Sequence, residues 1–172
     1  MDNRIVVPKI SAGSYRAHNH VRTAMVELVG RLGIKIIYPD GDIVDLGTVS
    51  ERVVTLAAIN VLVGVLQGGS ATTLQNFKYH ASGTGVTSEN STDTALVAEV
   101  EAREVGTQTS IIPGNYETVA QHAYAATFAI TEHGVFSALT GPTLFDRSKF
   151  SAVPVDNITQ LQFTYDLTIS GS

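Results

Sequence analysis

The stretch LQFTYDLTIS, residues 161–170, alternates apolar and polar side chains without a break. Successive side chains of a β-strand point to opposite faces of a sheet, so the stretch predicts a strand with one buried and one solvated face. The low share of charged residues, 16%, together with frequent Gly, Thr and Ser, also suits a β-rich protein. The predicted buried face consists of Leu161, Phe163, Tyr165, Leu167 and Ile169.

Two further segments extend the β pattern. Residues 33–47, GIKIIYPDGDIVDLG, predict a hairpin with its turn at residues 38–41, because proline presets φ and glycine accepts a positive φ. Residues 115–130, NYETVAQHAYAATFAI, predict one long strand. Residues 131–153 predict short strands around turns at 131–134 and 140–142. The aromatic side of the long strand is predicted to carry Tyr116, His122, Tyr124, Phe128 and Ile130.

One helix is predicted within residues 48–69, TVSERVVTLAAINVLVGVLQGG. Thr48 or Ser50 is the candidate N-cap, and Gly68 and Gly69 are suited to end the helix. Apolar residues surround nearly its whole circumference, which indicates burial on most sides. A buried pair of strands is the alternative, because valine is abundant, but the length of the segment favours the helix.

These patterns predict a mainly β fold, a β-sandwich or jelly-roll-like arrangement with one buried helix. Residues 1–20 keep neither period and are expected to form an extended N-terminal arm, while residues 21–172 form a single β-rich domain. A chain of 172 residues can bury a sizeable core. It contains no cysteine, which excludes disulfides, thiolate nucleophiles and cysteine zinc sites.

The charge distribution bears on the class of partner. The net charge is −5, from 16 acidic and 11 basic residues, and no basic cluster is present. Nucleic-acid binding needs local positive charge, so a nucleic-acid partner is not expected. The first residues lack the order of a signal peptide. The longest apolar run, residues 53–66, is too short to span a bilayer core of about 30 Å, so we expect a soluble chain without a membrane partner.

The sequence carries no motif of nucleotide or nucleophile chemistry. Gly83 and Gly85 in SGTGVTS follow a predicted strand, but a dinucleotide fingerprint needs glycine or alanine where Ser88 stands. A phosphate loop needs a lysine that the segment lacks, and no nucleophile elbow occurs. We therefore expect no enzymatic activity and no cofactor, and we interpret the two glycines as allowing a sharp turn at a strand end.

The histidines are interpreted as structural or contact residues. His18 and His20 could bind a divalent metal if a third ligand joined them, but contact with a neighbour or solvent is the favoured interpretation. His80, His122 and His133 are predicted to be isolated from one another. The position of His122 indicates an inner histidine with satisfied hydrogen bonds, and that of His133 indicates a ring that braces a turn.

Charged residues in the second half suggest local roles. Asp146 and Arg147 are interpreted as an exposed pair that orients a loop or interface. In SENSTDTAL, residues 88–96, Ser91 or Asp93 could cap a short helical turn. The segment that follows lacks the spacing of a calcium loop and indicates a solvated strand edge, with carboxylates at Glu99, Glu101 and Glu104.

Five segments together resemble a known group of proteins. FKYHASGTG, TDTAL, ITEHGVFSA, LFDRSKFSAV and LQFTYDLTIS occur in this order in the chain. They resemble segments of small structural proteins of tailed bacteriophages, over residues 77–170. Similar ends occur in tail-fibre-like proteins, while short versions without a shaft resemble capsid decoration proteins, also called cement or auxiliary proteins.

The resemblance implies a virion structural protein on the capsid exterior. Such a protein would bind the major capsid protein, bridge its subunits and form a homotrimer. The alternatives are a tail-fibre, tail or baseplate component, or a receptor- or carbohydrate-binding module. Acidity also suits an outer surface better than contact with packaged DNA. We expect partner contacts from the arm and from the loop around residues 82–95, through His18, His20, Ser82, Thr84, Glu89, Asn90 and Asp93.

Overall fold

The computed structural model describes residues 26–52, 54–109 and 113–171, with no account of the side chain at position 52. The predicted arm, residues 1–20, lies outside the described residues. In chain order the elements are β1 (Val26–Ile37), β2 (Ile43–Arg52), α1 (Leu56–Leu66), the 3-10 helix η1 (Leu74–Asn76), β3 (Tyr79–Gly83), β4 (Glu99–Val105), β5 (Thr107–Thr109), β6 (Asn115–Ala123), β7 (Phe128–Phe136), β8 (Leu144–Val155) and β9 (Gln160–Gly171).

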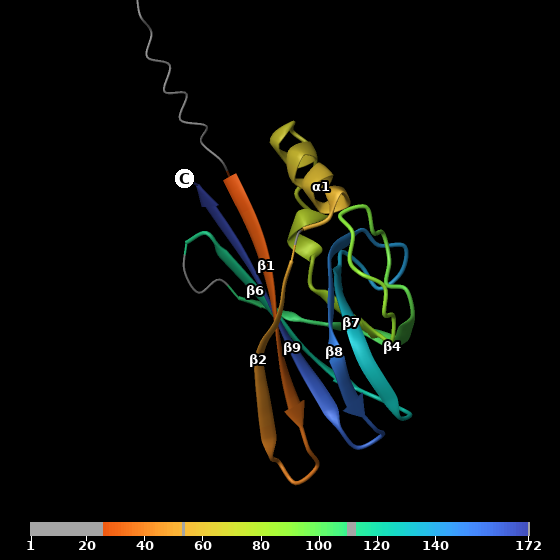
Figure 1. Ribbon diagram of the computed structural model, residues 1–172. Coiled ribbons are helices and arrows are strands. Elements are labelled where there is room, and N and C mark those ends of the chain that lie inside the picture. The colour runs from red at the N-terminus through yellow and green to blue at the C-terminus, as the bar shows by residue number, and fades with distance from the viewer. Residues whose placement is uncertain (1–25, 53, 110–112, 172) are drawn as a thin grey trace, which may run out of the picture.

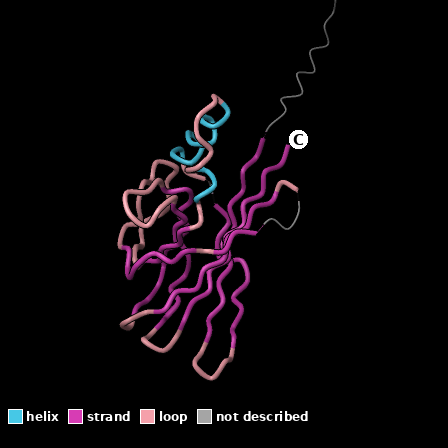
Figure 2. The backbone as a smooth tube through the Cα atoms, turned by 180° about the vertical axis from the view of Figure 1, so that it is seen from behind, coloured by secondary structure: helices cyan, strands magenta, loops and turns pink. Residues whose placement is uncertain are grey.

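The strands form two antiparallel sheets that face each other as a sandwich (Figures 1 and 2). The first sheet has the order β2-β1-β9-β6-β5, and the second has the order β4-β3-β7-β8. Helix α1 lies at one end of the sandwich, while the β1–β2 and β8–β9 turns lie at the other end (Figure 1). The predicted mainly β, sandwich-like fold with one α-helix is confirmed for the described residues.

The C-terminal strand β9 is central to its sheet, as its alternating sequence predicts. It pairs with β1 on one side and with β6 on the other. Leu161, Phe163 and Tyr165 are fully buried, whereas their polar neighbours are only partly covered. Ile169 departs from the prediction because it is 43% exposed near the end of the strand, beyond the main core.

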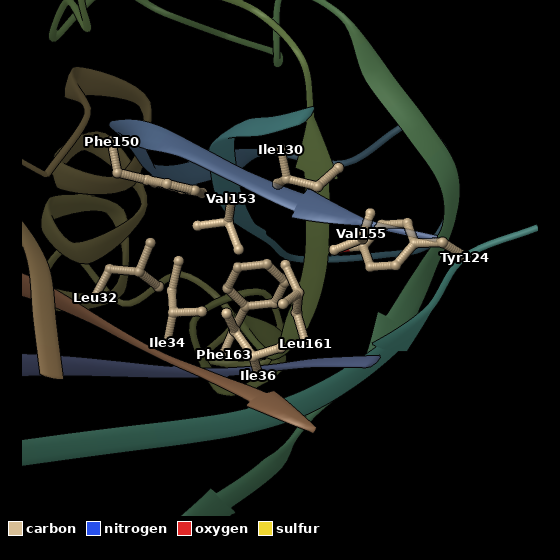
Figure 3. Packing of buried hydrophobic residues seen from close by; sticks show 10 residues of the cluster. All are labelled: Leu32, Ile34, Ile36, Tyr124, Ile130, Phe150, Val153, Val155, Leu161 and Phe163. Carbon is tan, nitrogen blue, oxygen red and sulfur yellow. The ribbon is translucent and has the colours of Figure 1, made fainter. Parts of the chain in front are cut away.

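The main core fills the space between the sheets. Alternate residues of β1, among them Leu32 and Ile34, project toward β7 and β8 and meet Ile130 and Val153 (Figure 3). Phe163 of β9 lies in the middle of this cluster (Figure 3). Burial of apolar area at roughly 25 cal/mol per Å² is what holds the two layers together.

The predicted hairpin of residues 33–47 is confirmed. The Tyr38 N–H donates to the Asp42 carbonyl oxygen, and the Gly41 N–H donates to the Tyr38 carbonyl oxygen. Gly41 has a φ of 91°, a backbone region in which glycine has no steric penalty.

The prediction of one strand over residues 115–130 is wrong. Strand β6 ends at Ala123, and β7 begins at Phe128 in the other sheet. Both Tyr124 in the connection and Ile130 in β7 are buried in the core. The apolar parity continues across the connection because both sheets bury their inner faces against the same core, so alternation alone does not reveal the change of sheet.

The prediction of a turn at residues 131–134 is also wrong, since β7 runs through this segment to Phe136. Every residue from Ile130 to Phe136 is buried, so both faces of the strand are covered. The turn predicted at residues 140–142 does lie between β7 and β8, with Gly141 at a φ of 60°.

The helix begins later than predicted. Residues 48–52 belong to β2, and α1 starts at Leu56 with Thr55 as its N-cap. The Thr55 side chain accepts a hydrogen bond from the Ala58 N–H at 3.2 Å, and its hydroxyl donates to the Leu144 carbonyl oxygen at 2.7 Å. The predicted glycine stop is confirmed, because Gly68 follows the helix with a φ of 89°.

The prediction that the helix is buried on most sides is wrong. Ala58 is its one fully buried residue, and Leu66 is 80% exposed. The helix covers one end of the sandwich and does not lie between two layers (Figure 1). An apolar circumference therefore does not correspond here to burial within this chain.

Candidate functional site: the loop between β3 and β4

The loop of residues 84–98 joins β3 to β4 and brings four predicted contact residues onto one segment. They are Thr84, Glu89, Asn90 and Asp93. Ser82 is different, because it lies in β3 with no exposure and its Oγ accepts a hydrogen bond from the Tyr124 hydroxyl. The prediction that Ser82 contacts a partner is therefore wrong. His18 and His20 lie outside the described residues.

The buried side chain of Arg147, on β8, forms hydrogen bonds to the loop and fixes its position. Its Nε donates to Glu132 Oε2 at 2.8 Å, and its Nη1 donates to Asp93 Oδ2 at 2.9 Å. The same guanidinium donates to the carbonyl oxygens of Thr87 and Ser88. The prediction of an exposed pair with Asp146 is wrong, since both residues are buried. The predicted role of Arg147 in orienting a loop is confirmed by these contacts.

Glu132 of β7 joins the two ends of the loop. Its Oε1 accepts from the backbone N–H of Gly85 at 3.0 Å and from that of Ala98 at 2.7 Å. Its Oε2 accepts from the Val97 N–H at 3.1 Å as well as from Arg147. Hydrogen bonds to an ionised group are roughly twice as strong as neutral ones. A single buried carboxylate thus fixes where the loop leaves and rejoins the sheet.

Gly83 and Gly85 make room for this carboxylate. A Cβ on Gly83 would lie 2.6 Å from Glu132 Oε1, and one on Gly85 would overlap the same oxygen. Neither glycine has a positive φ. The interpretation that these glycines allow a sharp turn is therefore wrong. They are needed because the Glu132 side chain packs closely against the backbone at both positions.

The tip of the loop is a compact polar turn. The Asn90 N–H donates to Asp93 Oδ2, and Asn90 Oδ1 accepts from the N–H and the hydroxyl of Thr92. The helical turn predicted here is absent from residues 88–96, which form turns and bends. Glu89 Oε1 accepts from the Lys149 N–H, which ties the tip to β8.

Two exposed valines flank the tip. Val86 is 70% exposed and Val97 is 57% exposed, at the two ends of the loop. The loop therefore presents a polar tip between two apolar side chains, in a conformation that Arg147 and Glu132 hold from within the protein. Such a surface is suited to contact with another macromolecule.

A second cluster of polar side chains, made mainly of histidines, lies between the two sheets. His80 Nδ1 is 2.9 Å from His133 Nε2, and His80 Nε2 is 3.1 Å from Thr118 Oγ1. The His133 ring stacks on Phe163 with 4.5 Å between ring centroids, and His122 contacts the same phenyl ring edge-on. The prediction that these histidines are isolated is wrong, and His133 lies within β7 and braces no turn.

His122 is buried, as predicted, but it is not satisfied. Neither of its ring nitrogens has a hydrogen-bond partner among the described residues. Burial lowers the pKa of His122 to about 4. Burial, followed by the charge of His122, lowers the pKa of His80 to about 3. Burial also lowers the pKa of His133 well below its usual value, so all three rings are neutral near pH 7.

The described part of the chain offers no cluster of three or more His, Cys, Asp or Glu side chains arranged to hold a metal ion. Glu99, Glu101 and Glu104 lie on β4, an edge strand, and are exposed, as the predicted solvated edge requires. Charged side chains on an edge strand oppose pairing with another chain.

Glu132 is a functional residue that was not predicted from the sequence. A signal was present, because Glu132 lies in AITEHGVF among residues typical of a buried strand. A carboxylate in such a run needs a cationic partner, and Arg147 in LFDRSKF occupies a similar apolar context. The pairing itself could not be derived from the sequence, since it depends on the adjacency of β7 and β8.

Comparison with known proteins adds no identification. A scan against protein-family models, a search of curated proteins and a search of solved structures each return no match. Within the described residues, α1 and every other helical segment fall short of the length and hydrophobicity needed to cross a bilayer.

Proposed function

We propose that this protein is a virion structural protein of the capsid-decoration type. It would bind the outer face of the capsid, bridge subunits of the major capsid protein and assemble as a homotrimer. The sequence resemblance over residues 77–170 motivates the proposal. The observation that carries it is the loop of residues 84–98, whose exposed tip is held by the buried ion pair of Arg147 and Glu132.

The conformation of the loop suits a contact function. A contact surface that is already ordered loses less conformational entropy on binding, which favours affinity. Val86 and Val97 supply apolar area, and the turn around Asn90 supplies hydrogen-bonding groups. Stable protein interfaces bury about 1,600 Å² in total, so further surface must contribute. Repetition over a symmetric shell then multiplies the binding through avidity.

A binding experiment tests this role directly. Capsids that lack the protein are incubated with the purified chain, and occupancy and position are read by electron cryomicroscopy. We expect density on the outer capsid surface. Val86→Glu on the loop is expected to reduce occupancy, whereas Ile158→Glu on the β8–β9 turn, which is 60% exposed and away from the loop, is the matched control. Equal binding by both variants would mean that the loop does not take part in the interface with the capsid.

The same micrographs decide between head and tail. Density found only on the tail would replace the decoration role with a tail-fibre, tail or baseplate role. A carbohydrate-binding module would present aromatic platforms, but among the described residues Tyr38 is the one exposed aromatic side chain. The binding role on the capsid is therefore preferred to the carbohydrate-binding one.

A further inference from the structure

An apolar cavity of about 190 Å³ lies beneath helix α1. Ala58 and Leu62 of the helix form one wall, and Leu28 of β1 and Leu167 of β9 form the facing wall. Phe77 and Phe145 also line the cavity. The helix and the ends of β1 and β9 stand apart at this end of the molecule (Figure 1), and the cavity lies between their side chains.

The cavity offers water almost nothing to bind. Among the described lining residues, Tyr116 is the one with a polar side chain, and its hydroxyl already donates to the Phe77 carbonyl oxygen and accepts from Gln108 Nε2. An apolar cavity of about 150 Å³ in another protein stays dry and binds benzene or xenon. The space beneath α1 is larger and has the same chemistry, so it can take a somewhat larger apolar molecule.

Charge selects the class of ligand further. Residues 53–77, which supply five of the lining residues, contain no charged side chain. A carboxylate or an ammonium group placed here would lose its hydration without gaining a counter-charge. The walls therefore accept a neutral apolar molecule and reject its charged analogue.

The cavity is also reachable from solvent. Ile169 lines it while remaining 43% exposed, and Leu62 is partly exposed on the helix. The helix is fixed at its beginning, where the Thr55 N–H donates to the Phe145 carbonyl oxygen and the Leu56 N–H donates to the Ser91 carbonyl oxygen. A ligand can enter beside Leu62 without breaking these anchoring hydrogen bonds.

We propose that the cavity beneath α1 is a binding site for a small, uncharged apolar molecule of about the size of toluene. This site is separate from the loop of residues 84–98 and does not depend on the proposed role of that loop. Filling the space restores van der Waals contacts that its walls lack when it is empty. A ligand that binds only the folded protein also raises the midpoint of thermal unfolding.

Toluene is the probe, and benzoate is the charged control of similar shape. The full chain is titrated with each compound while the unfolding temperature and the methyl NMR resonances are followed. We expect a saturable rise in unfolding temperature with toluene, together with shifts of the Leu28, Leu62 and Leu74 methyl signals. Benzoate is expected to produce neither effect. No saturable response to toluene, or an equal response to benzoate, would overturn the proposal.

Two substitutions on the same helix localise the site. Ala58→Leu places a larger side chain in the cavity and is expected to weaken toluene binding by roughly tenfold or more through loss of space. Ala57→Leu, at the neighbouring position outside the cavity wall, is expected to leave binding unchanged. If Ala58→Leu does not fold, Leu62→Phe narrows the cavity from its opening and takes its place. Undiminished binding in the variant that fills the cavity would refute the site.

Discussion

Arg147 on β8 and Glu132 on β7 form a buried ion pair, with 2.8 Å between Arg147 Nε and Glu132 Oε2 and side-chain exposures of 1% and 0%. Each partner has further hydrogen bonds, to three backbone N–H groups for Glu132 and to Asp93 and two carbonyl oxygens for Arg147. Removal of one partner would leave the other as an uncompensated buried charge. The stability of the loop and of the second sheet are thereby linked.

Arg147→Met is expected to destabilise the protein by about 3–5 kcal/mol, because the Glu132 charge stays buried without its partner. Urea unfolding monitored by circular dichroism measures the change. Arg31→Met is the matched control, since Arg31 pairs with Glu51 on the exposed side of β1 and β2. Loss of that pair is expected to change the free energy of unfolding far less, because solvent screens an exposed ion pair.

The double variant Glu132→Gln with Arg147→Met separates the ion pair from general packing. Because both charges are removed together, its cost is expected to be smaller than the sum of the two single costs. Additive costs, or a cost for Arg147→Met no larger than that for Arg31→Met, would contradict the buried network.

Gly85→Ala is expected to destabilise the protein and to loosen the loop, because the new Cβ would overlap Glu132 Oε1. Gly64→Ala is the control, and its effect on stability is expected to be opposite to that of Gly85→Ala. Gly64 lies within α1 with open space around the position of a Cβ, so alanine is expected to stabilise the helix by about 0.5–1 kcal/mol. Thermal unfolding gives both signs, and amide hydrogen exchange at residues 84–98 reports on the loop. Two changes of the same sign would contradict the packing described around Glu132.

Phe163→Ala is expected to cost about 3–5 kcal/mol, because the ring is fully buried between the sheets and stacks on His133. Tyr38→Ala removes an exposed aromatic side chain and is expected to change stability by less than about 0.5 kcal/mol. Chemical unfolding compares the two. A negligible cost at Phe163 would mean that the faces of β9 are assigned the wrong way round.

The histidine cluster predicts sensitivity to acid. The pKa of His80 is lowered to about 3 and that of His122 to about 4, while histidines in the unfolded chain protonate near pH 6.5. The unfolded state therefore binds more protons below pH 6.5, so stability is complete above that pH and falls as the pH drops toward 4 and 3. Each histidine contributes at most about 1.4 kcal/mol per pH unit within this window.

His122→Leu tests this origin of the pH dependence. Unfolding free energies measured between pH 7 and pH 4 should fall less steeply in the variant than in the parent protein, since one titrating group is absent. His122 is the suitable position because its ring nitrogens have no hydrogen-bond partner among the described residues, so no hydrogen bond is lost. An unchanged slope would assign the acid sensitivity to other groups.

The contribution of Asp146 to stability depends on pH in the opposite direction to that of the histidines. Burial raises the pKa of Asp146 to about 7, so its contribution to stability is complete below the unfolded value near 3.8 and is lost as the pH rises through 7. Asp146→Asn is therefore expected to gain stability relative to the parent at pH 8 and to gain little at pH 4. Urea unfolding at the two pH values measures this difference.

Asp156→Asn is the matched control for Asp146→Asn. The hydrogen bond from Thr159 is the main cause that lowers the pKa of Asp156, so this carboxylate contributes stability above its unfolded pKa. Its removal is expected to be unfavourable at pH 8 and to matter less at pH 3. The same pH trend in both variants would contradict the distinction between a buried and an exposed carboxylate.

Local patterns predicted several elements correctly. The alternation in residues 161–170 predicted β9, and proline and glycine chemistry predicted the turn between Tyr38 and Gly41. The helix was predicted with its glycine stop but with the wrong start. Residues 48–52 form part of β2 instead, because they pair with β1. In the candidate site, Asp93 was predicted on the loop and Arg147 was predicted to orient a loop, whereas the role of Glu132 and its pairing with Arg147 were not predicted.

The sequence by itself determined the strand of residues 161–170, the turn at residues 38–41 and the glycine stop of the helix, because these features depend on side chains only a few residues apart. Only the tertiary structure decided that β6 and β7 belong to different sheets, that Arg147 meets Glu132, and that three distant histidines share one interior. Those contacts arise from the pairing of strands far apart in sequence. An alternating pattern states that a face is buried but contains no information about which strand it will meet.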